Sequence, residues 1–452
     1  MSEVKLIGVD ELKQVFDPGL SRVLEAYREI MGRQSLSRPL IVEKDSGVVV
    51  DGVEVLEALK LLSASKAPIV LASRDEIKIF RVKPVEESIG IDKLLEEYSR
   101  RGRLALEEFR LEFSIKPESV PFSLEDLGVS WEVDRRRLRV YDDTLSLLVD
   151  NWPTPLVRLK SFSIGGKAVY AKLEAFNPFS NSVKDRVGWS MIMEALEKGL
   201  LGDVLYEATS TNTGIALASI ANILGKRAKL FIPKSIQKVS DTFLKVLGAE
   251  VVRMPVSLTV EAIGDVEAMA KRDKATHLNQ FENDANFKVH LKYTARELDQ
   301  QLTSIGVEPD YIIGGLGTSG HMSAISIYFK SKYGEKVKLI GVQPAPKEII
   351  PGIRRIESGM KWVHLAEFDE VIDVTLDEAI EGALEVARKE GLLIGLSSGA
   401  VFQAFKKISA DGGNFVLIFP DSGYKYAEQF EKYFRKPGIL HGNGREDRGR
   451  EV

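Results

Sequence analysis

From about residue 150 onward, short apolar runs rich in Val, Ile and Leu alternate with longer stretches of helical periodicity that often end in glycine. Alternation of this kind predicts parallel strands joined by helices, in sheets that are covered on both faces. The expected strands lie at 205–208, 228–233, 250–254, 311–315, 338–342 and 415–420. Ligands of open α/β sheets bind beyond the carboxyl ends of the strands, so the loops that follow these runs are where a site is expected.

The sequence before residue 130 lacks this regular alternation. Short strands are expected at 39–43, 47–51 and 67–72, a helix at 53–62, and a charged amphipathic helix or helix pair at 91–113. At 452 residues the chain is too long for one typical core. We therefore predict a small α/β domain at 1–90, a helical connector at 91–135, a catalytic α/β domain at 136–435 and a disordered tail at 436–452.

Composition excludes several classes of function. The net charge of −4 gives no basic surface for nucleic acid, and no apolar stretch is long enough to cross a bilayer. The absence of cysteine rules out disulfides, thiolate nucleophiles and cysteine-ligated metal sites, and we expect no metal. The first residues lack the layout of a signal peptide, so we expect a cytoplasmic protein with neither nucleic-acid nor membrane partners. Many charged residues without cysteine also fit a thermophilic origin.

Lys184 stands between a strand-like run at 169–174 and a helical pattern at 187–200, at the expected first turn of that helix. A cation is unfavourable at the positive end of the helix dipole. The misfit disappears if the amine is bound as a Schiff base to a carbonyl cofactor. The ordinary alternative is a solvated lysine, and three further loops of matching chemistry decide against it.

These three loops also join a strand to a helix. Residues 209–214 place hydroxyls, an amide and backbone N–H groups at a helix start, which suits a carboxylate, with a plain helix cap as the alternative. Residues 314–321 suit a phosphate, but they also spell G-x-G-x-x-G, so a nucleotide-binding regulatory module is the rival. The acidic residue that a dinucleotide site needs is missing after the next strand. Residues 396–399 form a Ser-Ser-Gly turn, which taken alone is an ordinary cap.

Taken in order along the chain, these loops resemble those of the fold type II pyridoxal-phosphate enzymes of the cysteine synthase group. The resemblance extends from Trp152 to Tyr424 and includes five separate motifs. It implies two open, mostly parallel α/β subdomains with pyridoxal 5′-phosphate between them, and a homodimer. Lys184 would carry the cofactor as a Schiff base and act as the base at Cα.

The resemblance also assigns the other site residues. Asn212 would lie beside the 3′-oxygen of the pyridoxal ring. Ser397 would face the ring nitrogen, where a neutral hydroxyl favours β-elimination over transamination. The cofactor phosphate would be bound by Gly317, Thr318, Ser319, Gly320 and His321, the last of which stands where the group usually has threonine. The carboxylate of the amino acid would be bound by Thr209, Ser210, Thr211, Thr213 and Gln280.

Within this group the sequence most resembles the archaeal O-phosphoserine sulfhydrylases, over residues 279–287, 317–324 and 351–359. The last stretch has Arg354 where enzymes acting on O-acetylserine have apolar residues or glycine, and a guanidinium matches a phosphate. We therefore expect a cysteine synthase that converts O-phosphoserine and sulfide into L-cysteine and phosphate through an aminoacrylate. Arg355 is expected to form a surface ion pair with Glu348 or Glu357. O-Acetylserine sulfhydrylase and a cystathionine β-synthase-type enzyme are the alternatives.

Residues 1–90 resemble the ParB-like fold, which includes free serine kinases. The cue is the two short strands at 39–43 and 47–51, followed by Gly52. Kinase-like members continue with histidine and arginine, whereas Val53 and Glu54 follow here, and the first 276 residues contain no histidine. We expect a role in dimerisation, regulation or as a lid, and no kinase activity.

Overall fold

The computed structural model of the protein describes residues 3–82, 87–129 and 141–437. Its larger subdomain is built on a six-stranded sheet in the order β12-β13-β21-β18-β19-β20. All neighbours pair in parallel except β12, the antiparallel edge strand. The strands are β12 (Leu156–Arg158), β13 (Lys167–Leu173), β18 (Tyr311–Gly315), β19 (Lys338–Pro344), β20 (Glu370–Val374) and β21 (Gly413–Phe419).

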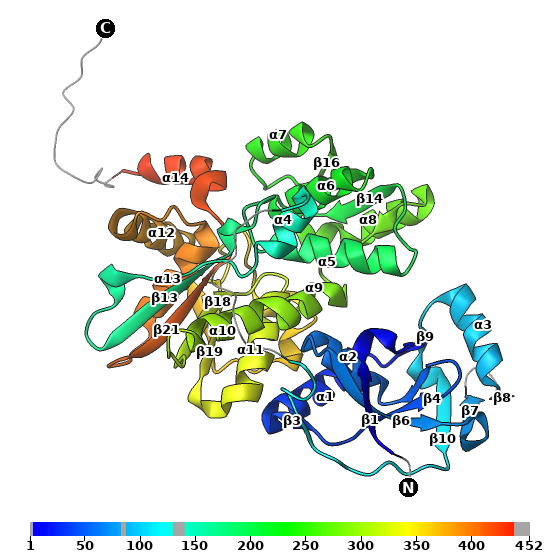
Figure 1. Ribbon diagram of the computed structural model, residues 1–452. Coiled ribbons are helices and arrows are strands. Elements are labelled where there is room, and N and C mark those ends of the chain that lie inside the picture. Colours follow the sequence, from blue (N-terminus) through cyan, green and yellow to red (C-terminus); the bar gives the residue numbers. More distant parts are fainter. Residues whose placement is uncertain (1–2, 83–86, 130–140, 438–452) are drawn as a thin grey trace.

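The smaller subdomain has a fully parallel sheet in the order β16-β15-β14-β17. Its strands are β14 (Val204–Ala208), β15 (Arg227–Pro233), β16 (Glu250–Met254) and β17 (Thr276–His277). The helices around it are α5 (Lys184–Glu197), α6 (Asn212–Ile223), α7 (Val239–Val246) and α8 (Ile263–Asp273). Figure 1 shows the two subdomains side by side, and the predicted α/β fold with a preceding small α/β region is confirmed.

Helices pack against both subdomains and complete the catalytic half. They are α4 (Thr144–Asp150), α9 (Asp284–Val289), a π-helix (His290–Ala295), α10 (Arg296–Thr303), α11 (Gly320–Tyr333), α12 (Leu376–Glu390), α13 (Leu396–Lys407) and α14 (Ala427–Phe434). In the part of the chain that the structure describes, no helix has both the length and the apolar character that a membrane crossing needs.

The N-terminal lobe contains a four-stranded sheet in the order β1-β6-β4-β5 and a three-stranded sheet in the order β10-β7-β8. These strands are β1 (Lys5–Gly8), β4 (Leu40–Glu43), β5 (Val49–Asp51), β6 (Lys66–Ala72), β7 (Ile77–Arg81), β8 (Glu87–Ile89) and β10 (Phe109–Phe113). The helices are α1 (Leu20–Arg33), α2 (Val53–Leu61) and α3 (Ile91–Arg101). Two further two-stranded pairs join β2 (Phe16–Asp17) to β9 (Leu104–Ala105), and β3 (Ser35–Leu36) to β11 (Phe122–Ser123).

The prediction of helix throughout 91–113 is wrong beyond Arg101. Residues 109–113 form β10, which pairs antiparallel with β7. The sequence Phe-Arg-Leu-Glu-Phe alternates apolar and charged residues, and such a period of two presents one apolar face in a strand. The expected helical connector is thus partly strand that belongs to the N-terminal sheets, and its last residues, 130–135, lie outside the described ranges. The expected tail at 436–452 lies outside them from residue 438 onward.

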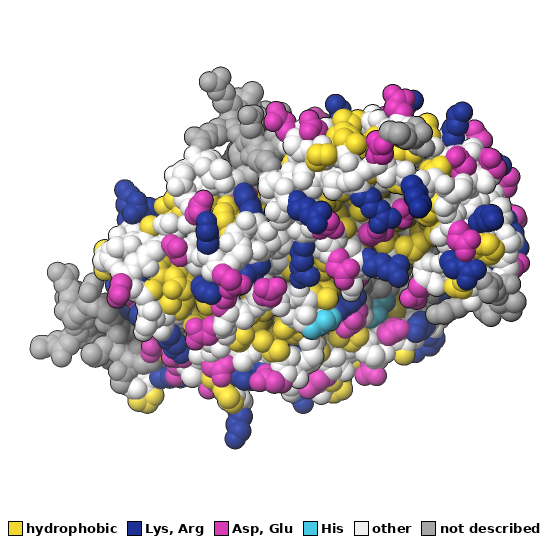
Figure 2. Space-filling view, turned by 90° about the horizontal axis from the view of Figure 1, so that it is seen from below, with side chains coloured by type: hydrophobic (Ala, Val, Ile, Leu, Met, Phe, Trp, Pro, Cys, Tyr) yellow, Lys and Arg dark blue, Asp and Glu magenta, His cyan; other side chains and the backbone are white. Residues whose placement is uncertain are grey.

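The N-terminal lobe and the larger subdomain share one hydrophobic core. Helix α1 packs on α11, and the buried cluster includes Tyr27 and Ile30 of α1 together with Leu291 and Ile325 of the catalytic half. Figure 1 shows the lobe, in blue and cyan, against α10 and α11. On the molecular face drawn in Figure 2, Lys and Arg are interspersed with Asp and Glu.

Candidate functional site

Lys184 is the first residue of α5, as the sequence predicts, and it is half-buried. Its backbone N–H donates to Ser182 Oγ at 3.1 Å, so a hydroxyl two residues earlier pairs with the first N–H of the helix. Burial lowers the pKa of the Lys184 amine to about 8, against the opposing effect of the Asp421 carboxylate. An amine with this pKa is partly unprotonated near neutral pH, which a nucleophile or a base requires.

The two residues that follow Lys184 hold its loop in place. The buried carboxylate of Asp185 accepts hydrogen bonds from the N–H groups of Phe179 at 2.7 Å and Ser180 at 2.8 Å. Burial nevertheless raises the pKa of Asp185 to about 6. The sequence pointed to Lys184, but the side chain that holds the loop in place is that of Asp185.

Arg186 has a fully buried guanidinium between two carboxylates. Its Nε lies 2.7 Å from Glu174 Oε2, and its Nη2 lies 2.7 Å from Glu297 Oε2. Glu174 follows β13, and Glu297 is in α10, so this ion triplet ties α5 to the larger subdomain. Such a buried arginine is tolerated because both faces of its charge are compensated.

The loop at 209–214 begins α6, with Thr211 as the residue before the helix. Thr213 Oγ1 donates to Gln280 Oε1 at 2.8 Å, so the structure brings together two of the residues expected at the carboxylate. Thr209 is buried, and its hydroxyl accepts the N–H of Gly214 at 3.0 Å, which is a helix-start contact. Thr211 shares a hydrogen bond of 2.7 Å with Ser240 of α7.

Glu207 lies beneath this loop and was not identified from the sequence. Its fully buried carboxylate accepts the N–H groups of Asn279 at 2.9 Å and Gln280 at 3.0 Å. Burial raises the pKa of Glu207 to about 7, although these two hydrogen bonds oppose the rise. It thereby fixes the segment that presents Gln280.

The glycine loop, residues 317–321, leads from β18 into α11. Three buried polar atoms around it have no hydrogen-bond partner among the described residues: Ser319 Oγ, His321 Nε2 and Asn286 Oδ1. A Cβ at Gly320 would lie 2.6 Å from Asn286 Oδ1, and one at Gly317 would lie 2.5 Å from the carbonyl oxygen of Gly352. Buried unpaired polar groups are rare unless a ligand completes them, so the chemistry of this loop fits a phosphate.

His321 stands where the cysteine synthase group usually has threonine, and the structure shows how the larger imidazole is accommodated. Its buried ring meets the ring of His290 edge to face, with centroids 5.9 Å apart. Burial lowers the pKa of His321 to about 3, so the ring is neutral and has one N–H to donate. His290 opens the π-helix and shares a 2.9 Å hydrogen bond between its Nδ1 and Thr294.

Arg354 lies against the glycine loop. Its Nε donates to the carbonyl oxygen of Gly317 at 2.8 Å, and its guanidinium stands 5.2 Å from the ring centre of Phe281. Ser397, in the first turn of α13, is buried. It lies close to Gly352 of the Arg354 segment, since a Cβ built on Gly352 would be 3.6 Å from Ser397 Oγ. The structure thus gathers Arg354, Ser397 and the glycine loop at one place.

Arg355 points elsewhere, in agreement with its expected surface role. Its Nη1 lies 3.1 Å from Asp373 Oδ1, and its Nη2 lies 3.0 Å from Glu357 Oε1. Two adjacent arginines therefore occupy different environments, and only Arg354 contacts the glycine loop.

Asn212, at the start of α6, contacts a C-terminal segment for which the sequence analysis proposed no function. Its Nδ2 donates to Asp421 Oδ2 at 2.8 Å, and its Oδ1 accepts from Lys425 Nζ at 2.5 Å. Asp421 and Lys425 are both buried. The resemblance to the cysteine synthase group extends into this segment, but nothing in the sequence indicated which side chains it contacts.

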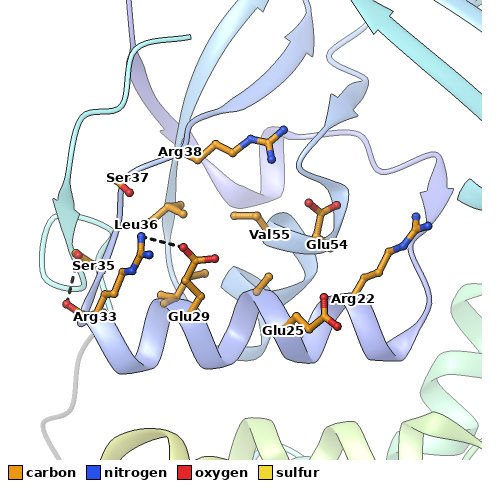
Figure 3. Close-up of a pocket in the computed structure, with 12 residues that line it drawn as sticks. Arg22, Glu25, Glu29, Arg33, Ser35, Leu36, Ser37, Arg38, Glu54 and Val55 are labelled. Atoms are coloured by element: carbon orange, nitrogen blue, oxygen red, sulfur yellow. Dashed lines mark hydrogen bonds and ion pairs between the residues drawn. The ribbon is translucent and has the colours of Figure 1, made fainter. Parts of the chain in front are cut away.

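A second hollow lies far from these loops, in the N-terminal lobe. It has a volume of about 470 Å³ between α1, the segment at 35–38 and the start of α2 (Figure 3). Two of its arginines pair with carboxylates on the surface: Arg33 lies 2.9 Å from Glu29, and Arg38 lies 2.6 Å from Asp51. We call this feature the N-terminal hollow.

The glycine loop, the polar start of α6 and Lys184 at the start of α5 converge between two open parallel sheets. A family model described as "Pyridoxal-phosphate dependent enzyme" matches residues 147–421, and the chain belongs to this family. It uses pyridoxal phosphate, whose phosphate the unpaired atoms around the glycine loop suit. The match begins after the N-terminal lobe.

Individual relatives indicate to which group within this family the chain belongs. The chain is 36% identical over 330 residues to the cysteine synthase of Buchnera aphidicola subsp. Schizaphis graminum (strain Sg), and the alignment covers 66% of this chain and 98% of that protein. The solved cysteine synthase (OASS) from Entamoeba histolytica has a TM-score of 0.57 at 28% identity, covering 67% of this chain and 94% of that one. The O-acetylserine dependent cystathionine beta-synthase from Helicobacter pylori has a TM-score of 0.56 at 28% identity, covering 61% and 94%. The chain is an enzyme of the cysteine synthase family.

Proposed function

We propose that this enzyme, a pyridoxal-phosphate dependent β-replacement transferase, converts O-phosphoserine and sulfide into L-cysteine and phosphate. The observation that carries the choice of substrate is Arg354. Its guanidinium contacts the glycine loop and forms no ion pair with a carboxylate within the described ranges. A half-buried arginine without a carboxylate partner is suited to an anionic ligand.

Each proposed role combines what the resemblance to the cysteine synthase group implies with the position of the side chain. Lys184 holds the cofactor covalently and takes the proton from Cα, for which its pKa near 8 is favourable. The backbone and hydroxyls of 317–321, together with the neutral His321, bind the cofactor phosphate. Ser397 gives the ring nitrogen a neutral partner, and the bound cofactor supplies the electron sink that lets the proton leave. Asn212 would hold the side of the cofactor ring that carries the 3′-oxygen.

The substrate would be held at two ends. Thr209, Ser210, Thr211, Thr213 and Gln280 form the expected carboxylate site at the start of α6. The 2.8 Å bond between Thr213 and Gln280 supports that grouping, whereas Thr209 also has a helix-start contact. At the other end, Arg354 would pair with the phosphate that leaves from Cβ. This pairing should strengthen as charge develops on the departing phosphate, so it accelerates elimination as well as binding.

O-Acetylserine is the second candidate, and the names of the relatives support it better than they support O-phosphoserine. The Helicobacter pylori protein is described as O-acetylserine dependent, and similar proteins such as the one from Buchnera aphidicola are named cysteine synthase without reference to a phosphate. Serine with homocysteine remains the alternative of the cystathionine β-synthase type. A homodimer is proposed from family membership, and light scattering on the purified protein tests it.

The adjacent arginines allow a controlled test of the substrate. The kcat/KM of the purified enzyme is measured with sulfide and each of O-phosphoserine, O-acetylserine and serine, in wild type, Arg354→Ala and Arg355→Ala. A charge-assisted hydrogen bond contributes about 1.5–3 kcal/mol, or roughly one to two decades in rate. We expect wild type to prefer O-phosphoserine. Arg354→Ala should lose at least about tenfold on this substrate and be spared on O-acetylserine, while Arg355→Ala should change neither.

Three results would point away from the proposal. Wild type that prefers O-acetylserine would make that substrate the function. Equal losses on both substrates in Arg354→Ala would show a structural arginine. Losses in Arg355→Ala that match those in Arg354→Ala would show that the whole segment, rather than one guanidinium, is needed.

A further inference from the structure

Lys425 connects the larger subdomain to three segments around the smaller one. It lies in a single 3-10 turn, Gly423–Tyr426, that follows β21, and it is buried. Its Nζ donates to the carbonyl oxygen of Ser180 at 2.7 Å and to Asn212 Oδ1 at 2.5 Å. Its own carbonyl oxygen accepts from Gln237, which follows β15. One residue therefore contacts the loop before α5, the start of α6 and the segment before α7.

Asp421 completes this arrangement from the same segment. Its Oδ2 accepts from Asn212 Nδ2 at 2.8 Å and from the Tyr426 hydroxyl at 2.6 Å. Lys425 Nζ lies 3.8 Å from the same oxygen. The other oxygen, Asp421 Oδ1, is buried without a partner among the described residues.

The amide of Asn212 is thereby fixed in one orientation. An ammonium can only donate, so it must face the carbonyl oxygen of the amide, and a carboxylate can only accept, so it must face the NH₂ group. Turning the amide by 180° would set like partners against each other at both ends. An amide is held in one orientation when one of its ends faces a donor and the other faces an acceptor, as here.

We propose that Lys425 is a positioning residue of the active site, which together with Asp421 orients Asn212 and keeps the loop that carries Lys184 in register with it. The inference rests on the proposed function in one respect, since the cofactor must lie between Lys184 and Asn212. A buried lysine carries a desolvation penalty that an apolar side chain would avoid. The hydrogen bonds from its Nζ to Ser180 and Asn212 offset that penalty, and both partners lie outside the segment that carries Lys425.

The charges around Lys184 give the proposal a signed readout. The Asp421 carboxylate acts on Lys184 from the C-terminal segment, and Lys425 Nζ lies 3.8 Å from that carboxylate. The neutral rings of His321 and His290 interact electrostatically with Lys184 from α11 and the π-helix. Removing the positive charge of Lys425 leaves Asp421 less compensated, which raises the pKa of Lys184. Removing the negative charge of Asp421 lowers it. Because an unprotonated amine is needed to bind the cofactor aldehyde, both changes shift the pH dependence of cofactor association.

The test uses full-length apo-protein and pyridoxal phosphate. The variants are Lys425→Met, Lys425→Arg and Asp421→Asn, and Lys432→Met on the exposed face of α14 is the matched control. The dissociation constant of the cofactor, the visible circular dichroism of the bound cofactor and the midpoint pH of the association rate are measured. We expect Lys425→Met to bind pyridoxal phosphate roughly tenfold more weakly, with altered dichroism and a raised midpoint. Lys425→Arg should recover most of the affinity, and Asp421→Asn should lower the midpoint.

Opposite shifts in the two variants cannot come from general destabilisation, which would act in one direction. Wild-type affinity and midpoint in Lys425→Met would overturn the inference. If Lys425→Met does not fold, the Asp421→Asn arm decides alone, and an unchanged or raised midpoint there refutes it. Failure of the proposed function is recognised separately, because wild type would then bind no pyridoxal phosphate or would not prefer O-phosphoserine.

Discussion

The catalytic site and the N-terminal hollow both present charged and polar side chains around a concave surface, but they differ in how those groups are satisfied. Around the glycine loop, Ser319, His321 and Asn286 each bury a polar atom that has no partner in the part of the chain that the structure describes. In the N-terminal hollow, Arg33 and Arg38 are more than half exposed and pair with carboxylates. Buried unpaired groups are destabilising until a ligand binds, whereas exposed ion pairs need none. The unmet hydrogen bonds, more than the size of a hollow, distinguish a site.

The largest expected effect tests the catalytic side of this comparison. Lys184→Ala should fold normally and lose about 10²–10⁴-fold in turnover, because the variant lacks both the covalent attachment and the base. Lys198→Ala, at the other end of α5 and exposed, is the matched control and should retain wild-type rates. Steady-state assays on both proteins, loaded with cofactor, make the measurement. Full activity in Lys184→Ala would remove the lysine from the site.

Next in size is a test of the unpaired atoms around the glycine loop. Gly320→Asp should place a carboxylate where a phosphate is expected and collide with Asn286, so the affinity for pyridoxal phosphate should fall roughly 10²-fold. Gly264→Asp is the control, because a Cβ at that position in α8 meets nothing within 4 Å. Absorbance of the purified proteins reports cofactor content. A Gly320→Asp protein that purifies fully loaded would refute the phosphate assignment.

A smaller effect is expected at Glu57, a buried carboxylate of the N-terminal lobe. Its ion pairs lie within the protein, so we expect it to stabilise the fold and to have no role in catalysis. Burial alone would raise the pKa of Glu57, but Lys288 at 3.0 Å and Arg103 at 3.3 Å hold it at about 2. A carboxylate with a depressed pKa stabilises the fold above its unfolded pKa and stops doing so as the pH falls through the folded value. Wild type should therefore lose this contribution between about pH 4.5 and pH 2.

Glu57→Gln should destabilise the protein by about 1–3 kcal/mol at pH 7 and flatten the acid dependence in that window. Glu29→Gln, an exposed partner in the N-terminal hollow, should change unfolding by no more than about 0.5 kcal/mol. Urea unfolding at pH 7 and pH 3 compares the two. If Glu29→Gln has the larger effect, the division between buried and surface pairs does not hold in this lobe.

We expect the N-terminal hollow to have no serine kinase activity. Incubation of the enzyme with serine and ATP or ADP should yield no phosphoserine, since Arg38 holds Asp51 in an ion pair and Val53 follows where a kinase-like histidine would stand. Chromatographic detection of phosphoserine is the measurement, with Asp51→Asn as the comparison. Phosphoserine that forms only when Asp51 is present would make the lobe an enzyme and end the contrast between the two regions.

The features that the sequence predicted correctly are those with a local signature. Alternating apolar runs predicted the parallel strands, and because carboxyl ends of parallel strands meet at one edge, they also predicted that Lys184, Thr213 and the glycine loop would converge. Residues without a local pattern were missed. Asn286 bonds to Thr318, 32 positions away, and Lys425 bonds to Asn212, 213 positions away. No spacing rule links them.

The strand β10 shows a second reason for failure. Its alternation of apolar and charged residues comes a few residues after a helix that is also rich in charged residues, and the period of 2 is confined to five residues. Pairing with β7, about 30 residues earlier, decides between the two structures. The π-helix at His290 has no readable sequence signal for the same reason, since a single inserted backbone turn depends on what packs around it.

The core that α1 shares with α11 has a consequence for how the protein opens. Tyr27 of α1 and Ile325 of α11 belong to the same buried cluster. We therefore expect the N-terminal lobe and α11 to unfold together, although the sequence places them in different domains. A ligand bound at the start of α11 stabilises the entire unit that unfolds with this helix. Amide hydrogens in α1 should therefore exchange more slowly when pyridoxal phosphate is bound, although no residue of α1 belongs to the site. If the glycine loop binds the cofactor as proposed, the exchange rates in the N-terminal lobe would report whether that loop is occupied.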